Sequence, residues 1–216
     1  MGSVVERISS LDGTLVTDVG SVKGPVMREI EPLVAERGGR FVGSHPMAGS
    51  EKVGLAYAEP DLFVEAAVIL TGGVDRPDRD HDVELLQSFW RGLGAIVSVM
   101  DGDRHDAVVA AISHLPHLLA AALVRTVLPS DPEAGNFCGG GFRDTTRVAA
   151  GPEDMWSGIL VDNQEAVSNR LEDLIDELKT WKGALDALDR DQLRGFLSEA
   201  RQLRETIRDL SPGAPD

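Results

Sequence analysis

The chain changes character at Gly102, and this change constrains its fold more than any other feature of the sequence. Before Gly102, short apolar runs bounded by Gly, Asp or Ser alternate with runs of helical spacing. After it, the apolar residues follow helical spacing almost throughout. Strands that alternate with helices are typical of a parallel sheet covered by helices. We therefore expect an α/β first part followed by an all-α second part.

The apolar patterns predict the individual elements of both parts. Strands are expected at residues 14–17, 40–44, 66–71 and 95–100, with helices at 25–37 and 82–93. The second part is expected to hold helices at residues 105–128, 152–163, 164–181 and 189–210. Pro116 lies inside the first of these and should kink it, because proline removes a backbone donor.

Charge and cysteine content exclude several classes of partner. Lys and Arg total 21 against 36 Asp and Glu, which gives a formal net charge of −15. Nucleic acids and anionic membranes are bound through basic surfaces, so we expect neither as a partner. The one cysteine, Cys138, excludes a disulfide framework, and the cytoplasm is the simplest compartment.

The most apolar stretch, residues 107–124, is predicted to be a buried helix rather than a membrane span. It contains Ser113, His114, Pro116 and His117. Polar groups inside a membrane-spanning helix are costly.

Two polar clusters follow predicted strands at the same edge of the sheet. The first, TDVGSVKG (17–24), places Ser21 between a strand and a helix N-terminus, where ligands and anions bind. The second, GSHPMAGSE (43–51), places His45 where a neutral imidazole can act as a base. Taken singly, each cluster could be only a turn or a helix cap. Together they predict a functional site.

A third cluster lies in the apolar helix and comprises His105-Asp106 and SHLPH (113–117). His114 and His117 are three residues apart and share one side of a helix. Two ligands are too few for most protein metal sites, so no metal is predicted. Buried, hydrogen-bonded histidines and a polar pocket at the proline both stay open.

The fourth cluster is GGGFRDTTR (139–147). It lacks the GK[ST] of a phosphate-binding loop. Arg143 and Arg147 are four residues apart and would share a helical face, which in so acidic a chain indicates a dicarboxylate site. Alternatively, either arginine pairs with Asp144 or another acid.

These clusters, in this order, resemble the prephenate/arogenate dehydrogenase family of tyrosine biosynthesis. The matching residues are TDVGSVKG, GSHPMAGSE, HD, SHLPH, GGGFRDTTRVA and the Met155-Trp156 pair. The resemblance implies a partial Rossmann-like domain at residues 1–101 and a helical substrate and dimerisation domain at 102–211, and the residues 212–216 are expected to form a disordered tail. It implies an NAD- or NADP-dependent oxidative decarboxylation of prephenate or arogenate. We expect a homodimer, because the helices at 164–181 and 189–210 offer more apolar surface than a small domain needs.

The resemblance also implies a role for individual residues. His45 would accept the proton of the substrate's ring hydroxyl, and Ser21 would lie beside that hydroxyl and the nicotinamide. Other residues would bind substrate (Arg147, His117, Ser113, Arg143), line the cofactor (Thr17, Asp18, Ser21) or reach the partner subunit's site (Ser50, Glu51).

The chain departs from the family at its beginning. A dinucleotide-binding domain opens with a strand, a GxGxxG turn and a helix, and no such pattern precedes Thr14. The glycine-rich phosphate loop is thus absent from this chain, and about 80 residues of such a domain are expected to be missing. A start codon placed too late is the favoured explanation, over a fragment or a truncated gene product.

Two other function classes stay open. One is a catalytically inactive remnant that acts only as a helical dimer or binding module. The other is a dehydrogenase for 3-hydroxy acids or 6-phosphogluconate, against which the motifs SHPMAG and GGGFRDTTR argue.

Overall fold

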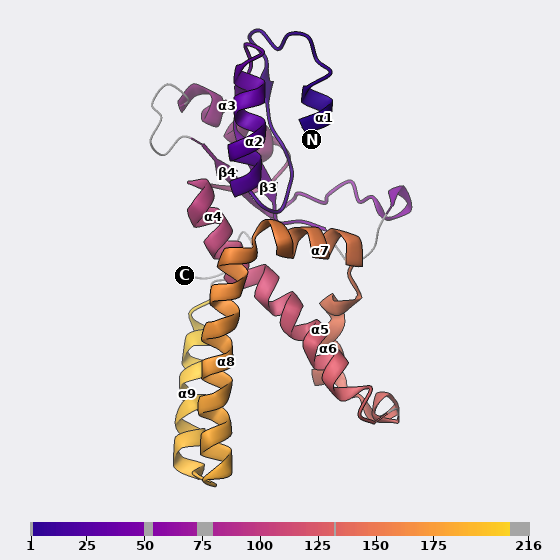
Figure 1. Ribbon diagram of the computed structural model, residues 1–216, viewed down its shortest axis with the longest axis vertical. Coiled ribbons are helices and arrows are strands. Elements are labelled where there is room, and N and C mark those ends of the chain that lie inside the picture. The colour runs from indigo at the N-terminus through magenta and orange to yellow at the C-terminus, as the bar shows by residue number, and fades with distance from the viewer. Residues whose placement is uncertain (1, 50–53, 73–79, 132, 208–216) are drawn as a thin grey trace. The chain divides into compact units, whose positions relative to one another are not determined.

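The computed structural model in Figure 1 describes residues 2–49, 54–72, 80–131 and 133–207. The chain divides into two compact units, Met1–Val167 and Ser168–Asp216. The predicted tail at 212–216 and the residues Ser50 and Glu51 lie outside the described residues. The fold class is as expected, an α/β part followed by a helical part.

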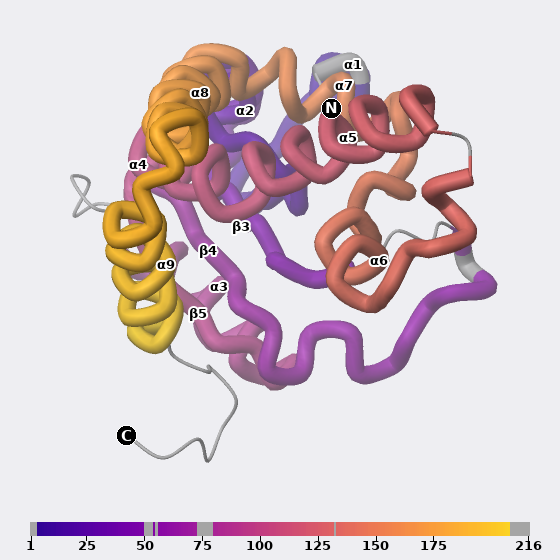
Figure 2. The backbone as a smooth tube through the Cα atoms, turned by 90° about the horizontal axis from the view of Figure 1, so that it is seen from below, coloured from indigo at the N-terminus to yellow at the C-terminus, as the bar shows by residue number. Residues whose placement is uncertain are grey.

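The strands form two small groups. β1 (Leu15–Val16) pairs with β2 (Arg40–Phe41), and β3 (Gly43–Pro46), β4 (Ala67–Thr71) and β5 (Ile96–Met100) lie side by side in that order, as Figure 2 shows. The β1–β2 and β4–β5 pairs are parallel, as the sequence predicts. The β3–β4 pair is antiparallel. The described part of its connection holds a short turn, η1 (Leu55–Tyr57), rather than the crossover helix that usually joins parallel strands.

Helices α2 (Gly24–Ala35) and α3 (Asp80–Gly92) build the cores of this part, and a short helix, α1 (Gly2–Val5), precedes them. Leu86 and Trp90 of α3 pack in one apolar cluster with Val68 and Leu70 of β4. The second cluster surrounds α2 and contains these buried residues: Val5, Leu11, Ile30, Val34 and Phe41. Each helix thus buries one apolar stripe, which is the pattern that predicted it.

The long apolar helix runs through three segments, α4 (Gly102–Val109), a π-helical segment (Ala110–His114) and α5 (Leu115–Val127). Asp101 caps α4, because its side chain accepts the Arg104 N–H at 2.7 Å. The irregularity expected at Pro116 occurs one turn earlier, as the π-helical segment. Pro116 has no N–H and its ring crowds the carbonyl four residues before it, so the backbone widens ahead of it.

By length and composition alone, the run Gly102–Val127 could span a bilayer, and it is the only such run in the described residues. Four of its polar side chains are buried: His105, Asp106, His114 and His117. Three of them, His105, Asp106 and His114, are hydrogen-bonded to other side chains. The most apolar 18 residues of the run are only 28% buried, so the expectation of a buried helix is confirmed only in part.

Shorter helices complete the first unit. They are η4 (Ala134–Phe137), α6 (Gly140–Thr146), η5 (Arg147–Ala150) and α7 (Glu153–Asp162). The expected helix at 152–163 is thus present.

The second unit is a helical hairpin made by most of α8 (Gln164–Asp186) and by α9 (Arg190–Glu205), which run side by side in Figure 1. Trp181 and Phe196 join the two helices, with ring centroids 5.2 Å apart. Asp189 caps α9 through the Gln192 N–H at 2.9 Å. Many leucines of this hairpin are exposed, among them Leu178 and Leu203.

Candidate functional site

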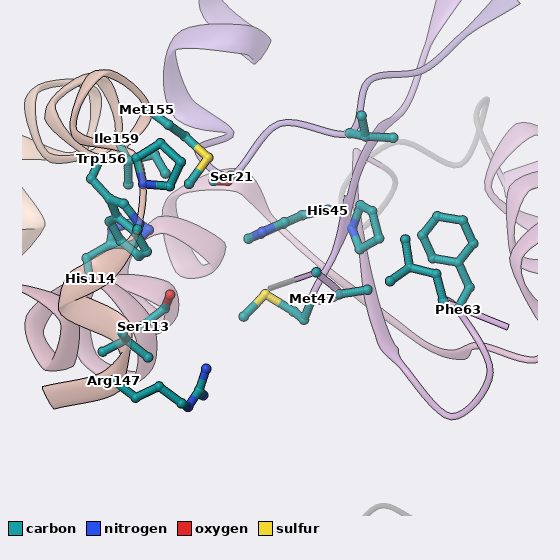
Figure 3. Close-up of a pocket in the computed structure, with 18 residues that line it drawn as sticks. Ser21, His45, Met47, Phe63, Ser113, His114, Arg147, Met155, Trp156 and Ile159 are labelled. Carbon is teal, nitrogen blue, oxygen red and sulfur yellow. The ribbon is translucent and has the colours of Figure 1, made fainter. Parts of the chain in front are cut away.

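A cavity of about 530 Å³ in the first unit collects residues from most of the sequence clusters. Its volume lies within the usual range for small-molecule sites. It is lined by Val19, Ser21, His45, Pro46, Met47, Ala48, Gly49, Leu62, Phe63, Ser113, His114, Arg147, Val148, Gly151, Pro152, Met155, Trp156 and Ile159. In Figure 3, His45 points toward the side that holds Ser113, His114 and Trp156.

His45 reaches the cavity from β3, where it pairs with Ile69 of the neighbouring strand. The residue is 7% exposed. Burial is the main cause that lowers the pKa of His45 to about 3. The ring is therefore neutral near pH 7, and one of its two nitrogens is a hydrogen-bond acceptor.

The loop after β1 is held by its own polar side chains. Asp18 accepts the N–H groups of Gly20 (2.8 Å) and Ser44 (3.1 Å) and forms a fully buried ion pair with Lys23. Burial is the main cause that lowers the pKa of Lys23. Thr17 is hydrogen-bonded to Ser44, Oγ1 to Oγ, at 2.8 Å. Thr17 and Asp18 thus brace the loop, whereas Ser21 lines the cavity.

Ser113 and His114 both line the cavity from the π-helical segment. Burial is the main cause that lowers the pKa of His114 to about 4. His117 does not line the cavity, although the sequence singled it out. It lies behind Trp156, and the two rings stack with centroids 3.5 Å apart.

Gly151 makes room for this stack. A Cβ at this position would lie 2.5 Å from Trp156 Nε1, so a side chain would displace the ring. Burial lowers the pKa of His117, and its Nδ1 is buried with no hydrogen-bond partner among the described residues. The stack therefore forms an aromatic wall of which Trp156 is the cavity side.

The structure places the two arginines of the fourth cluster differently. Arg143 lies in α6, is exposed and donates from Nε to the Cys138 carbonyl oxygen at 3.0 Å. Arg147 begins η5 and lines the cavity, whereas Arg143 does not. The cavity thus holds one of the two guanidinium groups that the sequence offers.

Sequence reasoning missed part of the lining. The motifs of the sequence contain three lining residues for which they predict no role: Met47, Met155 and Trp156. For His114, the sequence indicates only a pair with His117. Leu62 and Phe63 carried no signal, because they precede a strand in an ordinary apolar run.

The lining combines groups suited to a small anionic substrate. A neutral imidazole can take a hydroxyl proton, and a guanidinium can bind a carboxylate through two hydrogen bonds. Apolar side chains, including Met47, Phe63 and Trp156, exclude water around these groups.

Comparison with known proteins identifies the family. "Prephenate dehydrogenase, nucleotide-binding domain" matches residues 1–99, and "Prephenate dehydrogenase, dimerization domain" matches residues 101–208. A prephenate dehydrogenase of Bacillus subtilis is 36% identical over 196 residues, which are 89% of this chain and 52% of the relative. The chain therefore spans about half the length of this curated relative.

Solved structures agree with this assignment. The chain resembles prephenate dehydrogenase of Aquifex aeolicus in complex with hydroxyphenyl propionate and NAD+, with a TM-score of 0.84 and 33% identity. This match covers 96% of the present chain and 72% of the other. Arogenate dehydrogenase of Synechocystis gives a TM-score of 0.78 at 28% identity, over 94% of this chain and 72% of the other. The chain belongs to the prephenate dehydrogenase family.

Proposed function

We propose that the cavity oxidatively decarboxylates prephenate, with NAD+ as the hydride acceptor. The observation that carries this proposal is a neutral, buried His45 and a cationic Arg147 in the lining of one cavity. The chemistry needs both groups, because a hydroxyl proton must leave and a carboxylate must be held.

The residues that line the cavity bind the substrate and accept its proton. His45 takes the proton of the ring hydroxyl, and Ser21 hydrogen-bonds the same oxygen. Arg147 binds a substrate carboxylate, and Ser113 and His114 offer further polar contacts. A bound nicotinamide would supply the acceptor for the hydride on the carbon that bears the hydroxyl, while carbon dioxide is lost and the ring becomes aromatic. Because aromatisation favours the products, positioning is the main task of the protein.

The residues present fit the nicotinamide end of the cofactor. Val19 is 62% exposed and lines the cavity beside Ser21, which leaves a surface for a flat ring. Gly20 cannot be replaced without displacing Asp18, because a Cβ there would lie 2.9 Å from Asp18 Oδ2. Thr17 and Asp18 would support this surface from behind rather than touch the cofactor.

The relatives support the choice of substrate and cofactor. The Aquifex aeolicus protein was solved with NAD+ and hydroxyphenyl propionate, and we extend NAD+ and a hydroxyphenyl-type ligand to this chain. The Synechocystis relative acts on arogenate, so arogenate and NADP+ are the alternatives that an assay must compare. We place the activity in the cytoplasm, where a free cysteine such as Cys138 stays reduced.

An assay of cofactor reduction by the protein tests the proposal. NADH formation would be followed with prephenate and with arogenate, for the unaltered protein and for His45→Asn. We expect turnover with prephenate, and a fall in kcat of about 10²-fold or more in the variant. Binding of 3-(4-hydroxyphenyl)propionate, measured by tryptophan fluorescence, should change little.

A matched control is His81→Asn. His81 is an exposed histidine of α3 outside the cavity lining, so its replacement should leave both measurements unchanged. The absence of cofactor reduction with either substrate would overturn the proposal.

A further inference from the structure

A line of buried side-chain hydrogen bonds leads from the cavity into the interior behind His45. His45 Nδ1 lies 2.8 Å from His105 Nε2, and His105 Nδ1 lies 2.8 Å from Asp106 Oδ1. His105 is fully buried. The three residues come from β3 and α4, so the line joins two elements that are distant in sequence.

Asp106 determines which atom donates and which accepts in the hydrogen bonds of this line. Its Oδ1 accepts the Lys23 N–H at 2.8 Å, and its Oδ2 accepts the Gly24 N–H at 2.7 Å. Burial alone would raise the pKa of Asp106, but the hydrogen bonds from His105, Lys23 and Gly24 outweigh it and lower that pKa. An ionised carboxylate only accepts hydrogen bonds. The hydrogen between His105 and Asp106 therefore resides on His105 Nδ1.

The tautomer of His45 follows from that of His105. The Asp106 carboxylate already accepts two backbone N–H groups, so its hydrogen bond from His105 Nδ1 requires no charge on the ring. A neutral His105 with its hydrogen on Nδ1 has a bare Nε2, which must accept from His45 Nδ1. A neutral His45 then carries no hydrogen on Nε2. Its free lone pair is available to the cavity that the ring lines.

His114 is held in the opposite tautomer to His45. Asn163 Nδ2 donates to the main-chain oxygen of Asp106 at 2.8 Å and lies 3.2 Å from His114 Nδ1. A carbonyl can only accept, so the Asn163 atom at this position is the amide nitrogen, which has no acceptor capacity. His114 Nδ1 is therefore the acceptor, and the hydrogen of the neutral ring resides on Nε2.

We propose that Asp106 and His105 are positioning residues that hold His45 as a hydrogen-bond acceptor toward the cavity, while Asn163 holds His114 as a donor. This inference rests on the proposed function, because a proton acceptor at His45 is what that reaction needs. When His45 Nε2 takes the hydroxyl proton, one O–H bond breaks and one N–H bond forms. Nδ1 keeps its hydrogen throughout, and Nε2 returns the proton to the phenolate oxygen of the product once carbon dioxide has left.

The direct test is the tautomeric state of each histidine in the unaltered chain. Long-range ¹H–¹⁵N correlation spectra near pH 7.5 distinguish a ring protonated on Nδ1, on Nε2 or on both nitrogens. We expect Nδ1–H for His45 and His105 and Nε2–H for His114. Exposed His81 provides the reference for an imidazole in solvent, and single substitutions assign the signals. Nε2–H at His45, or both nitrogens protonated at His105, would overturn the inference.

A variant adds a readout that a purely structural role would not change. His105→Gln removes the ring acceptor that orients His45, so the His45 signals should shift toward the solvent reference. In the activity assay, kcat should fall by about 10²-fold with KM changed less than threefold, since general acid–base contributions are of that size. Asp103→Asn, an exposed position on the same helix, is the control and should behave like the unaltered protein.

The two readouts separate failure of this inference from failure of the proposed function. The expected tautomers without any activity would refute the proposed reaction and leave the positioning network standing. Activity with His45 in the Nε2–H form would refute the network alone. Unchanged kcat and unchanged His45 signals in His105→Gln would also refute it.

Discussion

At the scale of single residues, the clearest prediction is that Arg147 binds the carboxylate of the ligand. Arg147→Gln should weaken the binding of 3-(4-hydroxyphenyl)propionate by about 10- to 100-fold, because a charged hydrogen bond contributes about 1.5–3 kcal/mol. Fluorescence titration measures this change. Arg125→Gln, an exposed arginine in the last turn of α5, is the control and should bind normally. Equal affinity in both variants would remove Arg147 from the site.

The two cavity histidines also make the fold sensitive to acid. The pKa of His45 is lowered to about 3 and that of His114 to about 4, against 6.5 in an unfolded chain. Between pH 6.5 and pH 4, the unfolded state therefore binds protons that the folded state does not. The free energy of unfolding thus decreases as the pH decreases. Each histidine should contribute about 1.4 kcal/mol per pH unit.

Urea unfolding at pH 7.5, 6.5 and 5.5 would measure this slope. The range stays above the region where most carboxylates titrate. His45→Gln should reduce the loss of stability between pH 6.5 and pH 5.5, whereas His81→Gln should not. Stability that is flat over this interval would show that neither buried ring is held neutral.

At the scale of elements, the π-helical segment sets the phase between α4 and α5. It lets His105 face His45 while Ser113 and His114 face the cavity. Insertion of one alanine after Ile112 would exceed the single extra residue that the widened turn absorbs, and would rotate one flank by about 100° relative to the other. We expect the helix content to persist by circular dichroism, with binding of 3-(4-hydroxyphenyl)propionate lost.

Ile112→Ala is the matched control for that insertion. The Ile112 side chain is 62% exposed, so its truncation leaves the winding and the cavity unchanged. Binding in the insertion variant as tight as in this control would mean that the segment does not position the lining.

The same segment shows where prediction from sequence stops. Ser21 and His45 could be placed at one sheet edge, because each follows a strand. Helical spacing could put His114 and His117 on one side, but it could not say that His114 lines the cavity while His117 stacks behind Trp156. That outcome depends on a one-turn change of winding and on the space left by Gly151. The Asp106–His105–His45 line joins residues up to 60 positions apart, and no local pattern encodes it.

At the scale of the whole molecule, the two parts were predictable because their periodicities differ. Two-residue alternation and short buried runs require partners in a sheet, whereas helical stripes require partner helices. The antiparallel β3–β4 pair was not predictable, because the connection between them has no strong periodicity. The exposed leucines of α8 and α9 match the expectation from sequence that these helices have more apolar surface than one chain covers.

This surplus predicts a homodimer in solution. The exposed apolar side chains of the hairpin include Ile175, Leu178, Leu185, Leu197 and Leu203. Several large apolar side chains exposed on one helical hairpin are typical of an interface, and the region falls within the match to the family's dimerization domain. Equilibrium sedimentation at micromolar concentration should give twice the mass of one chain.

Leu178→Glu should shift the equilibrium toward monomer, because burying a leucine contributes about 1.5–3 kcal/mol. Glu172→Gln, exposed on the same helix, should not. A monomer at every concentration would contradict the prediction, and a dimer unaffected by Leu178→Glu would move the interface away from this face.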